Sequence, residues 1–171
     1  ALFSESCEEI ESAPMQPRRT QNRQLHPQTP DPHLPFENEP DTDFALIQNI
    51  RWGQEIVNHW KNHKPKTVPL VIGGKEIAHN EEGVGTDPSH PGKPLYRYAK
   101  AHKHHIDEAI SCAKAHEKEW AAATVEHRSQ LLARVAQKFR ERRGEFLGVM
   151  MIDGGKTLPE GDPEVSEAID F

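Results

Sequence analysis

Apolar residues recur every three or four positions in several long stretches of this chain, which is the pattern of amphipathic helices. The first stretch predicts a helix over residues 43–62, with an N-cap at one of residues 41–43 and an end before Pro65. A second helix is predicted over residues 105–121. The first stripe consists of Leu46, Ile47, Ile50, Val57 and Trp60, and the second of Ile106, Ala109, Ile110, Ala113 and Trp120.

Two further helices are predicted in the C-terminal half. Thr124 is the expected N-cap of one, and the basic run RERR (140–143) stands where cations favour a helix C-terminus. Helical periodicity resumes after Gly144 and ends at Gly154-Gly155, a pair suited to a C-cap. The stripe of the first helix consists of Val125, Leu131, Leu132, Val135 and Phe139, and that of the second of Phe146, Leu147, Met150 and Met151.

The final residues, GDPEVSEAIDF, predict a last helix. Asp162 is its expected N-cap and Pro163 its first residue, and Val165, Ala168 and Ile169 share one face. No glycine, lysine, arginine or proline follows that would end this helix. We therefore expect it to be the start of a longer helix that the chain interrupts.

Between these helices, the sequence predicts extended structure. Residues 68–72 and 75–77 flank Gly73-Gly74, which is typical of a β-hairpin with a two-residue turn. Residues 83–101 predict two short extended pieces around the turn residues of DPSHPG.

The first 40 residues lack this periodicity and hold seven of the fourteen prolines. Such a segment predicts either a mobile linker or a strap laid on a neighbour, and composition favours the linker. Nine acidic and three basic residues lie in residues 1–44, so the whole net charge of −6 comes from there. The balanced remainder argues against nucleic-acid binding. Without a long apolar run we expect no membrane span, and two distant cysteines predict a reducing, cytoplasmic setting.

Candidate reactive groups do not form a recognisable active site. The eleven histidines include His59 and His63, one helical turn apart, and the cluster at 102–105 (HKHH). A metal site needs three or four convergent ligands, so we interpret these as solvated side chains at helix ends, with a His-rich metal carrier as a weaker alternative. Cys112 lies in the middle of a predicted helix, where nothing lowers its pKa, and is interpreted as a packing residue. Residues 155–157 (GKT) are only the tail of a phosphate loop.

Three longer stretches, taken together, resemble aldehyde dehydrogenases over residues 66–171. DPSHPGKPLYRYAKAHKHHIDEAISCAKAHEKEW is similar to the opening of that family, HRSQLLARVAQKFRERRGEFLGVMMIDGGKT to its next helix pair, and EVSEAIDF to the start of the following long helix. FENEPDTDF (36–44) followed by VPLVIGGKEI resembles the branch that oxidises L-glutamate γ-semialdehyde, the 1-pyrroline-5-carboxylate dehydrogenases of proline catabolism. Some of these follow a flavin-dependent proline dehydrogenase, so the proline-rich segment is either a tether from such a domain or an N-terminal arm.

The resemblance implies an α/β parent fold with a Rossmann-like NAD domain, of which this segment is a mostly helical part with a β-hairpin. Residues 41–171 would be the N-terminal part of the dehydrogenase domain, behind a leader of residues 1–40. The family's nucleophilic Cys, its Asn, its Glu base and its nucleotide contacts lie downstream of Phe171. The resemblance therefore implies no catalytic, NAD-binding or metal residue here, and no activity for this segment alone. Its partners would be the remainder of its own polypeptide and further copies of the full enzyme.

One substrate contact is implied within the chain. In the semialdehyde branch a Glu three residues before the last Asp of this helix faces the substrate, and here it is Glu167. The substrate carries an ammonium group, which a carboxylate would pair with; the ordinary alternative is a solvated helix residue beside Asp170. Asp153 is a weaker candidate, for a monovalent cation site.

A rival hypothesis from another class is a non-catalytic helical interaction or docking module. Under the dehydrogenase hypothesis the helices would cover a sheet that lies mostly outside this chain. We therefore expect the stripe of Leu131, Leu132, Val135 and Phe139 to be incompletely buried.

Overall fold

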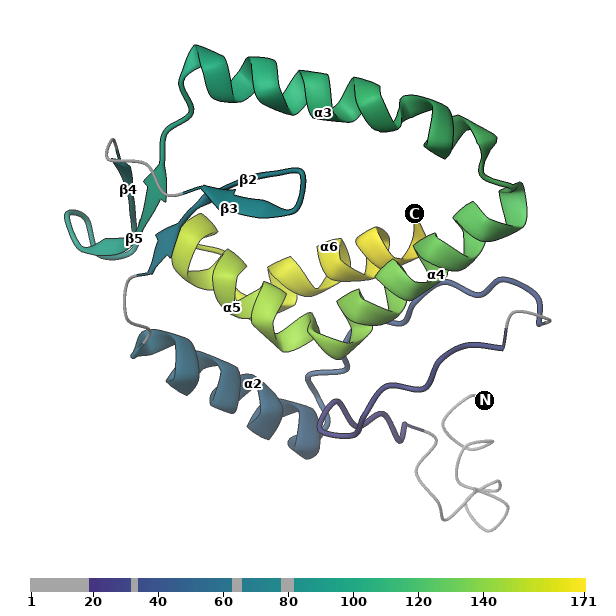
Figure 1. Ribbon diagram of the computed structural model, residues 1–171. Coiled ribbons are helices and arrows are strands. Elements are labelled where there is room, and N and C mark those ends of the chain that lie inside the picture. Colours follow the sequence, from purple (N-terminus) through teal and green to yellow (C-terminus); the bar gives the residue numbers. More distant parts are fainter. Residues whose placement is uncertain (1–18, 32–33, 63–65, 78–81) are drawn as a thin grey trace, which may run out of the picture.

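The computed structural model describes residues 19–31, 34–62, 66–77 and 82–171, and Figure 1 shows their arrangement. The helices are α2 (Ile47–Lys61), α3 (Lys103–Ala122), α4 (Val125–Glu141), α5 (Arg143–Gly154) and α6 (Leu158–Asp170). The strands are β1 (Thr67–Val68), β2 (Leu70–Ile72), β3 (Lys75–Ile77), β4 (Glu82–Thr86) and β5 (Pro94–Ala99).

The hydrophobic core lies among four helices. α5 packs against both α2 and α6, and α4 packs against α6 (Figure 1). The buried residues of this core are Ile56 of α2, Leu147 of α5, and Val165 and Ile169 of α6. Residues such as Trp52, Trp60, Phe139 and Met150 are partly buried around them. The core is small, as the low apolar content of the sequence requires.

Two small sheets complete the described fold. β1 pairs in parallel with β5, which pairs antiparallel with β4, and β2 and β3 form the predicted hairpin with Ile72 opposite Lys75. Gly73 and Gly74 have φ values of 57° and 76°, which a primed two-residue turn requires and which side chains resist. α3 runs over this hairpin in Figure 1 and contacts β2.

The predicted helices are confirmed, with corrected ends. α3 starts two residues before the predicted helix and ends one residue after it. The side chain of Thr124 accepts a hydrogen bond from the His127 N–H (3.1 Å), and Gly155 caps α5 in the left-handed conformation. The N-cap expected for α2 within residues 41–43 is wrong, because α2 begins at Ile47 behind Leu46, which makes no side-chain cap.

The expected start of the last helix is also wrong. α6 begins at Leu158, and a capping box satisfies its first turn: the Glu160 carboxylate accepts the Thr157 N–H (2.8 Å) and hydroxyl (2.7 Å). Asp162 and Pro163 therefore lie inside the helix. Asp162 has the side chain of a good N-cap, but it is buried and bonded to other parts of the chain.

Much of the described part of the proline-rich segment is bonded to the helices of the fold. We call residues 19–31 and 34–44 the strap. The Gln21 side chain accepts the Asp43 N–H (2.8 Å) and a proton of the Asn49 amide (2.9 Å), and Asn49 is completely buried. The linker interpretation therefore does not describe these residues, while residues 1–18 lie outside the described ones. The domain boundary at residue 40 stays a prediction.

Several apolar side chains remain exposed on α3 and α4, as expected. Leu132 and Val135 are 59% and 44% exposed, whereas Leu131 and Phe139 are half-buried. On α3, Ile106, Ile110 and Trp120 are about half exposed. Within the described ranges, no helix is long and apolar enough to cross a membrane.

Candidate functional site

Glu167, the predicted substrate contact, lies on the exposed face of α6. Its carboxylate makes no hydrogen bond or ion pair with any residue that the structure describes. One turn earlier, Glu164 pairs with Lys156, and Glu160 belongs to the capping box. Glu167 is therefore the one glutamate of this helix whose carboxylate is available to a ligand, and its role stays a prediction.

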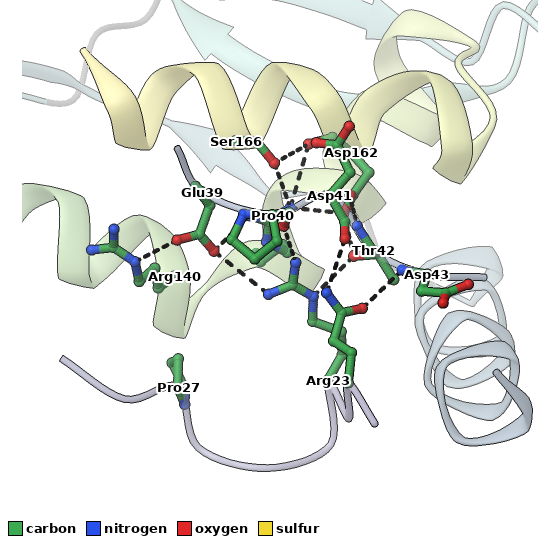
Figure 2. Close-up of polar contacts among 12 residues, drawn as sticks. Arg23, Pro27, Glu39, Pro40, Asp41, Thr42, Asp43, Arg140, Asp162 and Ser166 are labelled. Carbon is green, nitrogen blue, oxygen red and sulfur yellow. Dashed lines mark hydrogen bonds and ion pairs between the residues drawn. The ribbon is translucent and has the colours of Figure 1, made fainter. Parts of the chain in front are cut away.

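The opposite face of α6 is polar and buried. Asp162 accepts hydrogen bonds from the Thr42 main chain and hydroxyl (2.7 Å) and from the Arg143 guanidinium (2.9 Å). The side chains of Asp162 and Arg143 are each only 2% exposed. Figure 2 shows Asp162 and Ser166 on their helix facing Thr42 and Arg23 of the strap.

Glu39 extends this network to α4. Its carboxylate, 8% exposed, pairs with Arg140 (2.7 Å), Arg143 (3.0 Å) and Arg23 (3.5 Å) (Figure 2). Burial and the nearby charge of Arg143 lower the pKa of Arg23, although an arginine stays charged at any ordinary pH. The network joins strap, α4, α5 and α6 by buried ion pairs, and its two hydroxyl groups, on Thr42 and Ser166, are hydrogen-bonded within it.

Asp170 is a second connection between strap and α6. Its carboxylate accepts the Glu39 N–H (2.8 Å) and the Asn38 side-chain amide (2.8 Å). The strap therefore holds α6 near its start, at Asp162, and at its last residue, Asp170. Glu167 lies between these two points in the sequence, about one helical turn before Asp170.

Sequence reasoning missed this network although its residues stand in the quoted motifs. The run 140–143 predicts cations at a helix C-terminus, but the structure buries Arg143 and pairs both Arg140 and Arg143 with Glu39. FENEPDTDF contains Glu39 and Thr42, but by itself it indicates only the family resemblance. Three features of the sequence would together have indicated this network. They are the acidic strap, an RxxR pair one helical turn apart, and an Asp inside the apolar face of a helix.

The other candidate residues lie apart from α6. Asp153, at the end of α5, accepts the Tyr96 hydroxyl (3.0 Å), and this bond raises the pKa of Tyr96. The cation site suggested for Asp153 stays a prediction. Cys112 is half-buried, with its Sγ against the Gly73 turn of the hairpin, which is the packing position expected.

The histidines need one correction. His105 is buried, and its Nδ1 accepts the His102 N–H (3.1 Å), so it closes a capping box at the start of α3 and is not a solvated side chain. The His104 ring lies against that of His105, with ring centroids 3.8 Å apart and the ring planes tilted by 45°. Among the described residues, no three His, Cys, Asp or Glu side chains gather as metal ligands would. His63 lies outside them.

Comparison with known proteins places this arrangement in a family. Residues 75–171, more than half of the chain, match the aldehyde dehydrogenase family. The chain therefore belongs to the aldehyde dehydrogenase family. Among characterised members, it is 36% identical over 138 residues to 1-pyrroline-5-carboxylate dehydrogenase of Oceanobacillus iheyensis, which covers 81% of this chain and 27% of the relative. It is 31% identical over 137 residues to 1-pyrroline-5-carboxylate dehydrogenase 2 of Bacillus subtilis, and this match covers 80% of this chain and 27% of the relative.

Solved structures match about the same share of this chain as the relatives do. A 1-pyrroline-5-carboxylate dehydrogenase from Thermus with bound NAD matches with a TM-score of 0.77 and 31% identity, over 82% of this chain and 27% of that one. Proline utilization A (PutA) from Bdellovibrio bacteriovorus matches with a TM-score of 0.77 and 25% identity, over 82% of this chain and 15% of that one. The chain thus shares their fold and spans about a quarter of the length of the curated relatives. A match over 138 residues must also include part of the strap before residue 41.

Proposed function

We propose that this chain is the N-terminal segment of an NAD-dependent dehydrogenase that oxidises L-glutamate γ-semialdehyde to glutamate in proline catabolism. The observation that carries this proposal is the agreement of the relatives and solved structures named above, which bear the 1-pyrroline-5-carboxylate dehydrogenase name or that of PutA. The full enzyme would be cytoplasmic and homo-oligomeric, and it would belong to a larger polypeptide with a Rossmann-like NAD domain.

The chemistry of the full enzyme would be covalent catalysis. A cysteine thiolate would add to the aldehyde carbon, NAD would supply the two-electron oxidation as the hydride acceptor, and water activated by a glutamate would hydrolyse the thioester. These groups would be supplied by polypeptide beyond Phe171. By resemblance to the family, α6 would border the substrate entrance and present the exposed carboxylate of Glu167 to it.

Glu167 would bind the ammonium group of the semialdehyde. A charged hydrogen bond of this kind contributes about 1.5–3 kcal/mol, which corresponds to roughly a 10- to 100-fold change in affinity. The matched control is Glu164, one turn away on the same exposed face and already paired with Lys156. Glu167→Gln should raise the KM for the semialdehyde, and Glu164→Gln should leave it nearly unchanged.

The test is enzymatic. The reading frame through and beyond Phe171 is expressed, and NADH formation is followed with L-glutamate γ-semialdehyde and NAD. We expect activity from the full frame and none from residues 1–171 alone. NADH formation by the 171-residue chain, or a stop codon directly after Phe171 in the gene, would contradict the proposal and favour the docking module instead.

A further inference from the structure

The strap runs along α6 and is bonded to it at two places. Near the start of the helix, Thr42 donates to Asp162 from its main chain and its hydroxyl. At its end, Asp170 accepts the Glu39 N–H and the Asn38 amide, both at 2.8 Å. The chain directions are opposite, since the earlier strap residues meet the later helix residue.

The two contacts leave little slack. Residues 162 and 170 are eight positions apart, which is about 12 Å along a helix axis. The three steps from Glu39 to Thr42 span at most about 11 Å when fully extended. The strap must therefore run nearly straight, and neither a shift of α6 along its axis nor a rotation about it preserves both contacts.

The strap itself is anchored to the rest of the fold. The Glu39 carboxylate, 8% exposed, binds Arg140 of α4 (2.7 Å) and Arg143 of α5 (3.0 Å). Arg143 also binds Asp162 (2.9 Å). The strap thus fixes the position of α6, at both of its contacts, relative to the junction between α4 and α5.

Glu167 is close to one of these contacts on the helix surface. It precedes Asp170 by three residues, so the two side chains project about 60° apart around the helix axis. A rotation of α6 by about 10° would move a carboxylate that lies roughly 6 Å from the axis by about 1 Å. A displacement of that size would weaken the charged hydrogen bond of Glu167, whose whole contribution corresponds to roughly a 10- to 100-fold change in affinity.

We propose that Asn38 and Asp170 are positioning residues, whose contact sets the orientation in which Glu167 meets the substrate. This inference rests on the function proposed above and on the role of Glu167 there. Neither residue touches the substrate; both act through the rotation of α6. Their contact is accessible to substitution, because Asn38 is exposed and Asp170 is half-buried.

The experiment exchanges the two side chains in the full enzyme. Asn38→Asp alone sets two carboxylates against each other and breaks the contact. Asn38→Asp combined with Asp170→Asn restores an amide donor opposite a carboxylate, while the side-chain carbonyl of the introduced asparagine still accepts the Glu39 N–H. Asn58→Ala on the exposed face of α2 is the control for substitution in general. Each variant is assayed with the semialdehyde and with an aliphatic aldehyde of equal length that lacks the amino group.

We expect Asn38→Asp to raise the KM for the semialdehyde about 10-fold, with little change for the aldehyde without the amino group. The exchange should restore the KM, and Asn38→Asp should add nothing in a Glu167→Gln enzyme, because the two changes then act through one contact. Thermal unfolding checks that each variant is folded.

Other outcomes overturn the inference at different levels. An equal loss with both aldehydes, or a KM increase that persists in the Glu167→Gln enzyme, refutes positioning and leaves the proposed function intact. If Glu167→Gln has no effect, the substrate role of Glu167 falls together with the positioning role. If the unmodified full enzyme does not oxidise the semialdehyde, the proposed function itself is wrong.

Discussion

The buried pair of Asp162 and Arg143 gives the sharpest prediction about stability. Asp162→Ala removes a carboxylate that is 2% exposed and accepts hydrogen bonds from Thr42 and Arg143. Arg143 stays behind with Glu39 and Ser166 as partners but loses its main counter-charge on α6. The Thr42 N–H and hydroxyl lose their acceptor within the protein.

The expected cost follows from this burial. Removing one partner of a buried ion pair destabilises a protein by about 3–5 kcal/mol, because the other charge remains in a poorly solvated site. A domain of this size is stable by about 5–15 kcal/mol, so the substitution should remove roughly a fifth or more of the total. Combining it with Arg143→Met should cost less than the sum of the two single changes, by about 1–3 kcal/mol.

The assay is urea denaturation followed by tryptophan fluorescence, since Trp52 and Trp60 are packed against the core. The control is Asp107→Ala on α3, where the carboxylate is 58% exposed and pairs with Lys103 at 2.6 Å. Exposed ion pairs contribute up to about 1 kcal/mol, so this variant should unfold at nearly the same urea concentration as the unaltered chain. If Asp162→Ala costs no more than Asp107→Ala, the network is not the stabilising connection inferred here.

Three further predictions concern packing, pH and association. Gly148→Ala should destabilise the fold by about 1–3 kcal/mol in urea denaturation, because a Cβ there would overlap the indole ring of Trp60. Hydrogen bonds from the capping box lower the pKa of Glu160 from the usual 4.5. The ionised carboxylate therefore stabilises the fold above pH 4.5, and this contribution is lost as the pH falls through the lowered pKa. Glu160→Gln should flatten that part of a plot of unfolding midpoint against pH. The exposed apolar stripe should make the isolated chain self-associate in sedimentation velocity, and Leu132→Glu with Val135→Glu should reduce this.

Matched changes separate these effects from general damage. Gly154→Ala places a Cβ in ordinary van der Waals contact with Lys156, 3.9 Å away, and should not destabilise the helix. Leu25→Glu alters a strap residue that is 67% exposed and lies outside the stripe, so it should leave self-association unchanged. A compact, stable monomer of the unaltered chain would contradict the association prediction, and a midpoint that still falls equally with pH in Glu160→Gln would contradict the capping-box prediction.

Local sequence determined the elements that depend on local interactions. The apolar stripes of α2 and α4, the Thr124 cap and the Gly73-Gly74 turn each involve residues only a few positions apart. Periodicity and turn chemistry therefore located them to within a few residues. The family resemblance followed from the same stretches, because it depended on their order and spacing.

Tertiary structure decided what the charged residues do. Asp162-Pro163 is a good helix start by local chemistry, yet Asp162 is buried against Thr42, 120 residues away in sequence. The Thr157–Glu160 capping box consequently begins the helix one turn earlier. Glu39 likewise meets Arg140 and Arg143 across separations of 101 and 104 residues. A charge pattern along one chain does not reveal which distant charges come together, because that depends on how the helices pack; once packed, burial strengthens each pair and makes the strap part of the fold.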